Sequence, residues 1–333
     1  MDWTHSTSAM QLPQTLTPSA AILVSWLAAV AGCTPGGEPT VGDSFPDAEE
    51  LMAADRAFAL DSAERGAEAW SEVWAESGML YGDGEAPLIG PVAAARGVTE
   101  VVDDLRWEPT GSAMLWPGAV GYTVGFWWMA PETSGGGENR QRYLTVWQRI
   151  DNEWKVALDL SLPENDDDEA ARDFDFWLGD WTLEQRIWSG DGDQFESYTA
   201  RNQVRAIEGD GALVENLEGD VRFFWLGMQE PAHMRGVSVR LYDSDAGVWR
   251  IFWMDSLDPK FGPPFTGSFS GGIGNFLLTE RPDGIPPGRI RFEPRSDGTV
   301  DWQLAIRTAD GESWQPLWFI KFRRDERGKG SGT

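Results

Sequence analysis

Apolar residues recur at helical spacing over residues 48–74, which would direct one stripe of side chains toward a core. The stripe contains Leu51, Ala54, Phe58 and Ser62, and it continues after Gly66 with Trp70, Val73 and Trp74. A third helix is predicted over residues 91–105. Strands are expected over residues 79–81, 113–115, 120–130, 141–150 and 154–160. Because helices come first and a run of antiparallel strands follows, the pattern predicts an α+β layer fold over residues 46–164.

The second half of the chain carries a different pattern, in which turn signals such as Asp191-Gly192 and Asp310-Gly311 recur at close spacing. The runs between the turns are rich in Val, Ile, Phe, Trp and Thr, for example at residues 237–242, 248–254, 275–278, 289–293, 300–308 and 314–323. This spacing predicts an all-β domain, an antiparallel barrel or sandwich, over residues 172–327. An acidic linker over residues 165–171 would join the domains, and a disordered tail would follow over residues 328–333.

The strand predicted over residues 248–254 is apolar on both of its faces, because Phe252 and Met254 alternate with Trp249, Ile251 and Trp253. We therefore expect a cover on its outer side, supplied by the first domain or by the insertion over residues 257–274. Gly and Pro occur throughout that insertion, with Phe residues between them. It would form either a mobile lid or an ordered loop packed on the barrel.

Composition and charge exclude several classes of function. The chain has 333 residues and a formal net charge of −27. Such acidity argues against binding to nucleic acid and against docking on anionic lipid through a basic patch. The single Cys excludes an internal disulfide, and the presence of only two His residues argues against a His-rich metal site. A site built only of carboxylates stays open, but no metal or cofactor is predicted.

An apolar run over residues 20–31 is too short to span a bilayer comfortably and matches the core of a signal peptide. The sequence Val30-Ala31-Gly32-Cys33 resembles a bacterial lipobox, which implies that Cys33 receives a lipid. Residues 1–33 are therefore expected to be a lipoprotein signal peptide, and residues 34–45 a tether. The protein would be exported, in the periplasm or anchored to the outer membrane of a bacterium, and would touch the membrane only through its lipid. No Lys or Arg precedes Arg56, which departs from the signal-peptide pattern and leaves open a buried apolar segment with an incidental Cys.

The first domain carries five sequence words in one order, AADRAFALDSAERGAEAW, WEPTGS, GYTVGFW, RYLTVWQR and NEWKVALDL. They resemble the SnoaL-like or ketosteroid-isomerase-like branch of the nuclear transport factor 2-like superfamily. The resemblance implies a cone-shaped domain, in which a curved sheet wraps around helices to form a pocket. The superfamily includes isomerases, dehydratases and proteins without known activity, so the fold alone does not assign a reaction. The resemblance also implies homodimers through the face of the sheet.

The candidate residues for this pocket are Trp107, Tyr122, Arg142, Tyr143 and Trp147, with Asp159 as the candidate catalytic residue. The neighbours of Asp159 depend on the turn of the hairpin over residues 142–161. We favour a two-residue turn at Asp151-Asn152, which would place Arg142 diagonal to Asp159 and make them a pair that braces the sheet. A three-residue turn would instead place Tyr143, Thr145 and Trp147 beside Asp159. In a dry pocket the pKa of Asp159 would rise, and Asp159 would act as a general base.

The word Gly179-Asp180-Trp181 resembles the G-x-W signature that opens calycin, or lipocalin-like, β-barrels. The resemblance implies that Trp181 plugs the closed end of the barrel and that Arg323 or Arg324 from the last strand stacks across it. Further words, at residues 213–215, 236–238 and 310–314, resemble a family of bacterial calycin-like barrels. Arg240 and Trp253 are the candidate ligand-pocket residues of this domain. His233 is expected in a turn and is not expected to bind haem.

Three functions remain after these exclusions. We favour a protein that binds a small apolar or aromatic molecule in one or both pockets, because two pocket folds and 19 Trp occur without a recognisable catalytic set. The first alternative is a pocket enzyme, an isomerase or hydratase that transfers a proton through Asp159. The second alternative is a dimerising scaffold in which the cores of both domains are filled.

Overall fold

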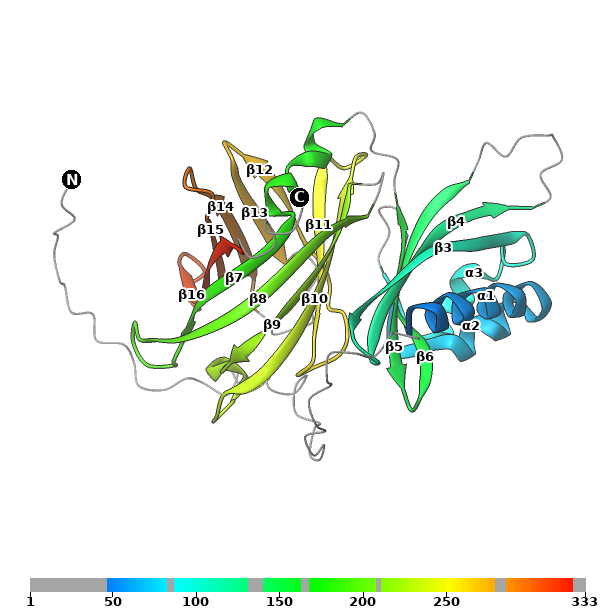
Figure 1. Ribbon diagram of the computed structural model, residues 1–333, viewed down its shortest axis with the longest axis horizontal. Coiled ribbons are helices and arrows are strands. Elements are labelled where there is room, and N and C mark those ends of the chain that lie inside the picture. The colour runs from blue at the N-terminus through cyan, green and yellow to red at the C-terminus, as the bar shows by residue number, and fades with distance from the viewer. Residues whose placement is uncertain are drawn as a thin grey trace, which may run out of the picture.

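The computed structural model describes residues 47–82, 87–130, 140–162, 168–207, 211–278 and 286–325. It shows two domains side by side, a sheet with helices on one face and a barrel (Figure 1). The predicted fold class, α+β followed by all-β, is confirmed. The predicted signal peptide with Cys33, the predicted tether over residues 34–45 and the predicted tail over residues 328–333 lie outside the described residues. No helix in the described ranges has the length and apolar character needed to cross a membrane.

The first domain contains the helices α1 (Asp47–Arg65), α2 (Ala67–Val73) and α3 (Pro91–Val98). Its strands are β1 (Trp74–Tyr81), β2 (Leu88–Ile89), β3 (Leu105–Trp116), β4 (Val120–Met129), β5 (Gln141–Ile150) and β6 (Glu153–Leu162). They form one sheet in the order β2-β1-β6-β5-β4-β3, in which β1 runs parallel to β6 and the other neighbours are antiparallel. The sheet curves, and the helices lie on one of its faces (Figure 1).

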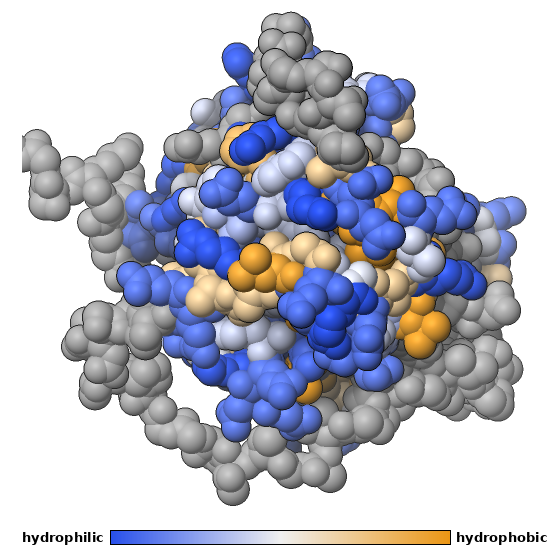
Figure 2. All heavy atoms as spheres, turned by 90° about the vertical axis from the view of Figure 1, so that its right-hand side faces the viewer, coloured by the Kyte–Doolittle hydropathy of each residue, from blue (hydrophilic) through white to orange (hydrophobic). Residues whose placement is uncertain are grey.

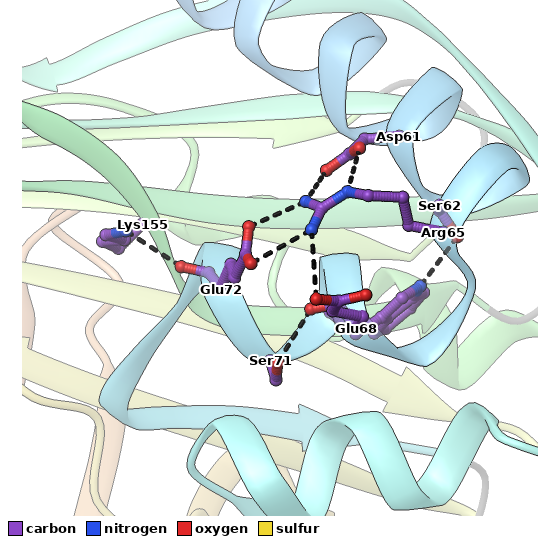
Figure 3. Close-up of polar contacts among 8 residues, drawn as sticks. Asp61, Ser62, Arg65, Glu68, Ser71, Glu72 and Lys155 are labelled. Atoms are coloured by element: carbon purple, nitrogen blue, oxygen red, sulfur yellow. Dashed lines mark hydrogen bonds and ion pairs between the residues drawn. The ribbon is translucent and has the colours of Figure 1, made fainter.

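A glycine and an arginine set the junction between α1 and α2. Gly66 has φ 63°, a positive value that favours glycine, and α1 ends directly before it. The Arg65 guanidinium donates to the Glu72 carboxylate of α2 at 2.7 and 3.0 Å and also pairs with Asp61 of α1 (Figure 3). Trp70 Nε1 donates to a buried α1 hydroxyl at 2.9 Å across the same junction. The predicted apolar stripe is therefore shared by two helices that fold back on each other.

Three boundaries in the first domain differ from the sequence prediction. Trp74, predicted as part of the helical stripe, begins β1, so this strand starts before residue 79. The third helix ends at Val98, because turns over residues 99–104 lead directly into a strand. That strand, β3, starts at Leu105 and is much longer than the predicted residues 113–115. Its pairing with β4 is interrupted by register shifts after Pro109 and after Met114. These irregularities break the alternation of apolar and polar residues that would have revealed the strand.

The second domain is a closed barrel of ten antiparallel strands, because the last strand pairs with the first. The strands are β7 (Gly179–Trp188), β8 (Phe195–Ile207), β9 (Ala212–Val221), β10 (Ala232–Asp243), β11 (Val248–Asp255), β12 (Phe265–Ser270), β13 (Ile273–Leu278), β14 (Gly288–Pro294), β15 (Val300–Arg307) and β16 (Trp314–Arg324). Two short 3₁₀ helices, η2 (Glu169–Arg172) and η3 (Asp175–Trp177), precede the barrel, and η4 (Phe224–Leu226) follows β9. Of the two predicted architectures, the barrel is confirmed.

Two predictions concern loops of the second domain. Of the two alternatives for the insertion, the mobile lid is wrong: Phe261 is buried against β11, and residues 265–270 form β12, which pairs with β11 and β13 in the barrel wall. Gly267 is needed in that strand, because a Cβ there would lie 1.9 Å from the Asn275 carbonyl oxygen. The prediction for His233 is also wrong. This residue lies in β10 rather than in a turn, and its ring contacts Glu218 and Asp220 on the outer surface.

Trp181 and Arg324 close one end of the barrel in the way the calycin resemblance implies. Trp181 is buried, and the Arg324 guanidinium lies 4.5 Å from the centroid of its ring. Arg324 also donates to two backbone carbonyl oxygens of the segment that enters β7, at 2.7 and 2.8 Å. Gly179 has φ 122°, and a Cβ at this position would lie 2.9 Å from Arg324. Arg323, the other candidate, instead contacts Glu184 on the exposed surface.

The sheet face that the helices leave uncovered packs against the barrel. The interface cluster is one buried group that includes Leu144, Val146, Leu158 and Leu160 of the sheet with Val237, Val239 and Leu241 of β10. Tyr81 meets Phe252 of β11 edge to face, with ring centroids 5.2 Å apart. Asn216 Nδ2 donates to the Leu115 carbonyl oxygen at 2.9 Å. The first domain therefore covers the outer side of β11, and Phe261 of the insertion packs in the same cluster. A homodimer through this sheet face would compete with the barrel for the same side chains.

Candidate functional site

The first domain holds a cavity of about 580 Å³ between its helices and the concave face of the sheet. Five aromatic side chains form much of its wall: Phe58, Trp70, Trp107, Trp127 and Tyr143. Val101 and Met129 line the cavity and are also 42% and 40% exposed, so they mark its mouth. Figure 2 shows this end of the molecule, where apolar side chains lie among charged ones. The size and the lining are typical of a site for a small molecule.

A β-bulge in β6 decides which way Asp159 points. The predicted two-residue turn is confirmed, and residues 151 and 152 have φ of 50° and 66°. The register then shifts by one residue at Ala157, so that Asp159 lies opposite Thr145. The predicted proximity of Arg142 to Asp159 is wrong, because the extra residue reverses the facing of every side chain after it.

Asp159 lies deep in the domain but keeps a surface that faces the cavity. Thr145 Oγ1 donates a hydrogen bond to Asp159 Oδ1 at 2.5 Å. Burial raises the pKa of Asp159 to about 7; the hydrogen bond from Thr145 opposes this shift, and the nearby Asp55 carboxyl adds to it. Near neutral pH, Asp159 is therefore present both as the acid and as the base, which suits a group that transfers protons.

Asp55 of α1 is a second acid at the same cavity, and the sequence analysis missed it. Tyr143 Oη donates to Asp55 Oδ2, and Trp107 Nε1 donates to Asp55 Oδ1, each at 2.8 Å. Burial raises the pKa of Asp55, and the hydrogen bonds it accepts partly oppose the shift. A signal was present, because Asp55 follows Leu51 by one helical turn and shares the buried stripe with Phe58. A carboxyl group on a buried helix face needs partners in the core.

The other pocket residues predicted for the first domain divide between the cavity and packed regions. The structure places Trp107 and Tyr143 in the cavity wall. Trp147 is fully buried in the core beneath the helices, where its Nε1 donates to a threonine hydroxyl. Tyr122 packs against the interface cluster, and the Arg142 guanidinium lies 5.7 Å from the ring of a neighbouring phenylalanine. None of these last three lines the cavity, so their prediction as pocket residues is wrong. Tyr122 and Arg142 point away from the helices, and Trp147 is covered by α1.

The cavity can hold an apolar guest and present it with a proton donor or acceptor. None of its described lining residues is Lys, Arg or His, so neither carboxyl group has a cationic partner in the wall. The described residues also contain no group of three or more His, Cys, Asp or Glu that would hold a metal ion. The titratable groups that the described lining presents to a guest are two acids and one phenol: Asp55, Asp159 and Tyr143.

The interior of the barrel is more crowded and contains a buried ion pair. Arg240 Nη2 and Glu215 Oε2 are 2.5 Å apart, and the two side chains are 3% and 5% exposed. Asn202 Nδ2 donates to the other carboxylate oxygen of Glu215 at 2.8 Å. Nε and Nη1 of Arg240 have no hydrogen-bond partner among the described atoms. Arg240 and Trp253, the predicted pocket residues, both line a space of only about 100 Å³. Glu215 was missed, although it points inward between Leu213 and Leu217 of β9.

The fold and the cavity define a cone-shaped α+β pocket domain followed by a closed β-barrel. Similar solved structures include an NTF-2 like protein of unknown function from Shewanella oneidensis MR-1, at 15% identity over 34% of this chain and 96% of that chain, with a TM-score of 0.29. A ketosteroid isomerase-like protein from Erwinia carotovora atroseptica matches at 12% identity over 35% of this chain and 95% of that chain, with a TM-score of 0.28. An NTF2-like protein of unknown function from Pseudomonas putida matches at 13% identity over 37% of this chain and 90% of that chain, with a TM-score of 0.31. No protein-family model and no curated protein matches the sequence.

Proposed function

We propose that the first domain binds a small, largely apolar or aromatic molecule. The observation that carries this proposal is the cavity of about 580 Å³, with its aromatic walls and its polar groups gathered around Asp55 and Asp159. Removal of apolar surface from water would supply most of the binding free energy, and the few polar groups would fix the orientation of the guest. The barrel interior is a weaker candidate, because its free space is about 100 Å³.

Calorimetric titration with the neutral aromatic probe 1-naphthalenemethanol tests the proposal. We expect saturable binding at one site in the wild-type protein. Val101→Trp would obstruct the mouth of the cavity and weaken this binding. Val92→Trp is the matched control, because Val92 is 80% exposed on α3 and does not line the cavity. Equal binding by both variants, or no saturation by the wild type, would contradict the proposal.

A second candidate function is proton transfer at a carbon atom next to a carbonyl group. The specific observation in its favour is that Asp159 has a pKa near 7, faces an open cavity and has no cationic neighbour in the described wall. As a base, Asp159 would take a proton from such a carbon and return a proton to it. The probe is exchange of the α-hydrogens of 2-tetralone in deuterated water, followed by NMR. We expect faster exchange with the wild type, and a loss of about 10²-fold or more with Asp159→Asn. Undiminished exchange in that variant would eliminate this mechanism.

We also propose that the protein is exported and anchored by lipid at Cys33, in the periplasm or at the outer membrane of a bacterium. The support is the apolar run over residues 20–31 and the lipobox-like word that ends at Cys33. Mass spectrometry of the membrane fraction tests the proposal. We expect a mature chain that begins at a diacylated Cys33, and an unmodified Cys33 in that fraction would refute it.

A further inference from the structure

The polar groups that face the first-domain cavity are acidic or neutral. The described lining contains six such residues: Asp55, Gln141, Tyr143, Thr145, Asp159 and Ser161. A buried carboxylate without a cationic partner is costly, so it either takes up a proton or acquires a positive partner. In this cavity the protein itself supplies no such partner among the described lining residues.

Asp55 and Asp159 differ in how much of their hydrogen-bonding capacity is used. Both oxygens of Asp55 already accept hydrogen bonds, from Trp107 and from Tyr143. Among the described residues, Asp159 accepts one side-chain hydrogen bond, from Thr145 to Oδ1. A carboxylate has about four acceptor positions, so Asp159 retains capacity for a donor inside the cavity.

The rings around these acids favour a positive charge as well as an apolar body. Trp107 packs against two other aromatic side chains of the wall, with ring centroids 4.9 Å from Phe58 and 5.9 Å from Trp70. The faces of Trp and Tyr rings attract cations, and this attraction strengthens where water is excluded. The formal net charge of −27 acts in the same direction at long range, because it attracts cations and repels anions.

We propose that the cavity selects molecules that carry an amine in its protonated form on an aromatic or apolar body, an inference that rests on the proposed binding function. The ammonium group would donate to the free side of the Asp159 carboxylate, and the body would lie against the aromatic wall. A charge-assisted hydrogen bond of this kind is about twice as strong as a neutral one. A carboxylate ligand would meet two acids and no cation among the described lining residues, so the cavity would reject it.

Three probes of one shape test the inference by calorimetry at pH 7: 1-naphthylmethylamine, 1-naphthalenemethanol and 1-naphthoate. We expect the amine to bind about tenfold or more tightly than the alcohol, and the carboxylate to bind most weakly. Asp159→Asn should remove the preference for the amine, so that the amine and the alcohol bind with similar affinity. Asp103→Asn is the matched control, because Asp103 is an exposed acid of the same domain that does not line the cavity. It removes the same charge and should keep the preference.

A second measurement needs no variant. Contact with an ammonium group favours the ionised form of Asp159, so binding of the amine should release protons, whereas binding of the alcohol should release none. Titration of the wild type in buffers with different heats of ionisation reports this release. If the alcohol binds as tightly as the amine, or if Asp103→Asn abolishes the preference equally, the inference is overturned while the proposed binding function stands. If no probe binds, the proposed function itself falls.

Discussion

Phe252 offers a direct test of whether the two domains form one packed unit. It points out of the barrel from β11, is 0% exposed, and contacts Tyr81 of the first domain edge to face at 5.2 Å. Replacement by Ala would remove a fully buried ring between two sheets, neither of which can collapse into the space. A Phe-to-Ala change at such a position costs about 3–5 kcal/mol, which combines the lost transfer free energy and the cavity left behind. We therefore expect Phe252→Ala to lower the free energy of unfolding by about that amount.

The assay is equilibrium unfolding in urea, followed by tryptophan fluorescence, with Phe319→Ala as the matched control. Phe319 also points out of the barrel, from β16, but it is partly exposed and contacts Phe195 rather than the first domain. Its replacement should cost about 1 kcal/mol. If the domains touched only transiently in solution, Phe252 would be exposed for most of the time. Equal, small effects of the two substitutions would then refute the packed interface.

Three further outcomes are expected from the buried and surface charges, each measured by urea unfolding. Arg240→Met should lower the free energy of unfolding by about 3–5 kcal/mol, because it leaves Glu215 buried without its partner. The double variant with Glu215→Leu should recover most of this loss, and a double variant as unstable as the single one would contradict this account. Arg324→Ala should lower the free energy of unfolding by about 2 kcal/mol, because it removes two hydrogen bonds to backbone carbonyl groups and a contact with the Trp181 ring. Arg323→Ala should lower it by at most about 0.5 kcal/mol. The reverse order would refute the role of Arg324 in closing this end of the barrel. The pKa of Asp159 is raised to about 7 by burial beside Asp55, so the folded chain binds its proton more tightly than the unfolded chain does. The free energy of unfolding should therefore fall as pH rises from about 4 to about 7, and it should fall less in the Asp159→Asn variant. If the free energies of the wild type and the variant changed in parallel with pH, the raised pKa of Asp159 would be contradicted.

Much of the fold could be predicted from the sequence, because the periodicity of a regular strand holds wherever no bulge interrupts it. The alternation on β10 correctly separates Val237, Val239 and Leu241 from Ser238 and Arg240, since a strand with period two leaves no other choice. The contact between Trp181 and a late Arg, which Arg324 makes, was expected from the resemblance to calycin-like barrels and not from a local rule. The strand β12 was missed because its wall position is set by neighbouring strands rather than by its own composition, which is rich in Gly and Ser.

The site was harder to predict than the fold, because its residues come from separate elements and from an irregularity. Asp55 reaches the cavity only when α1 packs on the sheet, and its partners Trp107 and Tyr143 come from β3 and β5. Asp159 was singled out correctly as a polar residue in an apolar strand, but its neighbours were not. The turn at Asp151-Asn152 predicts how β5 and β6 pair close to it. Nothing in the local sequence marks the extra residue at Ala157, which changes the pairing further along.

Because of the extra residue at Ala157, the direction in which Asp159 points depends on the length of β6 rather than on its composition. Without the extra residue, the side chains beyond it would exchange faces, and Asp159 would point into the interface cluster that Leu158 and Leu160 now occupy. The loss of one codon would therefore turn Asp159 away from the cavity while leaving this residue itself unchanged. Two relatives that both keep this aspartate would differ in chemistry if only one of them kept the bulge. For this site, the history of insertions and deletions in β6 is more informative than the identity of the residue.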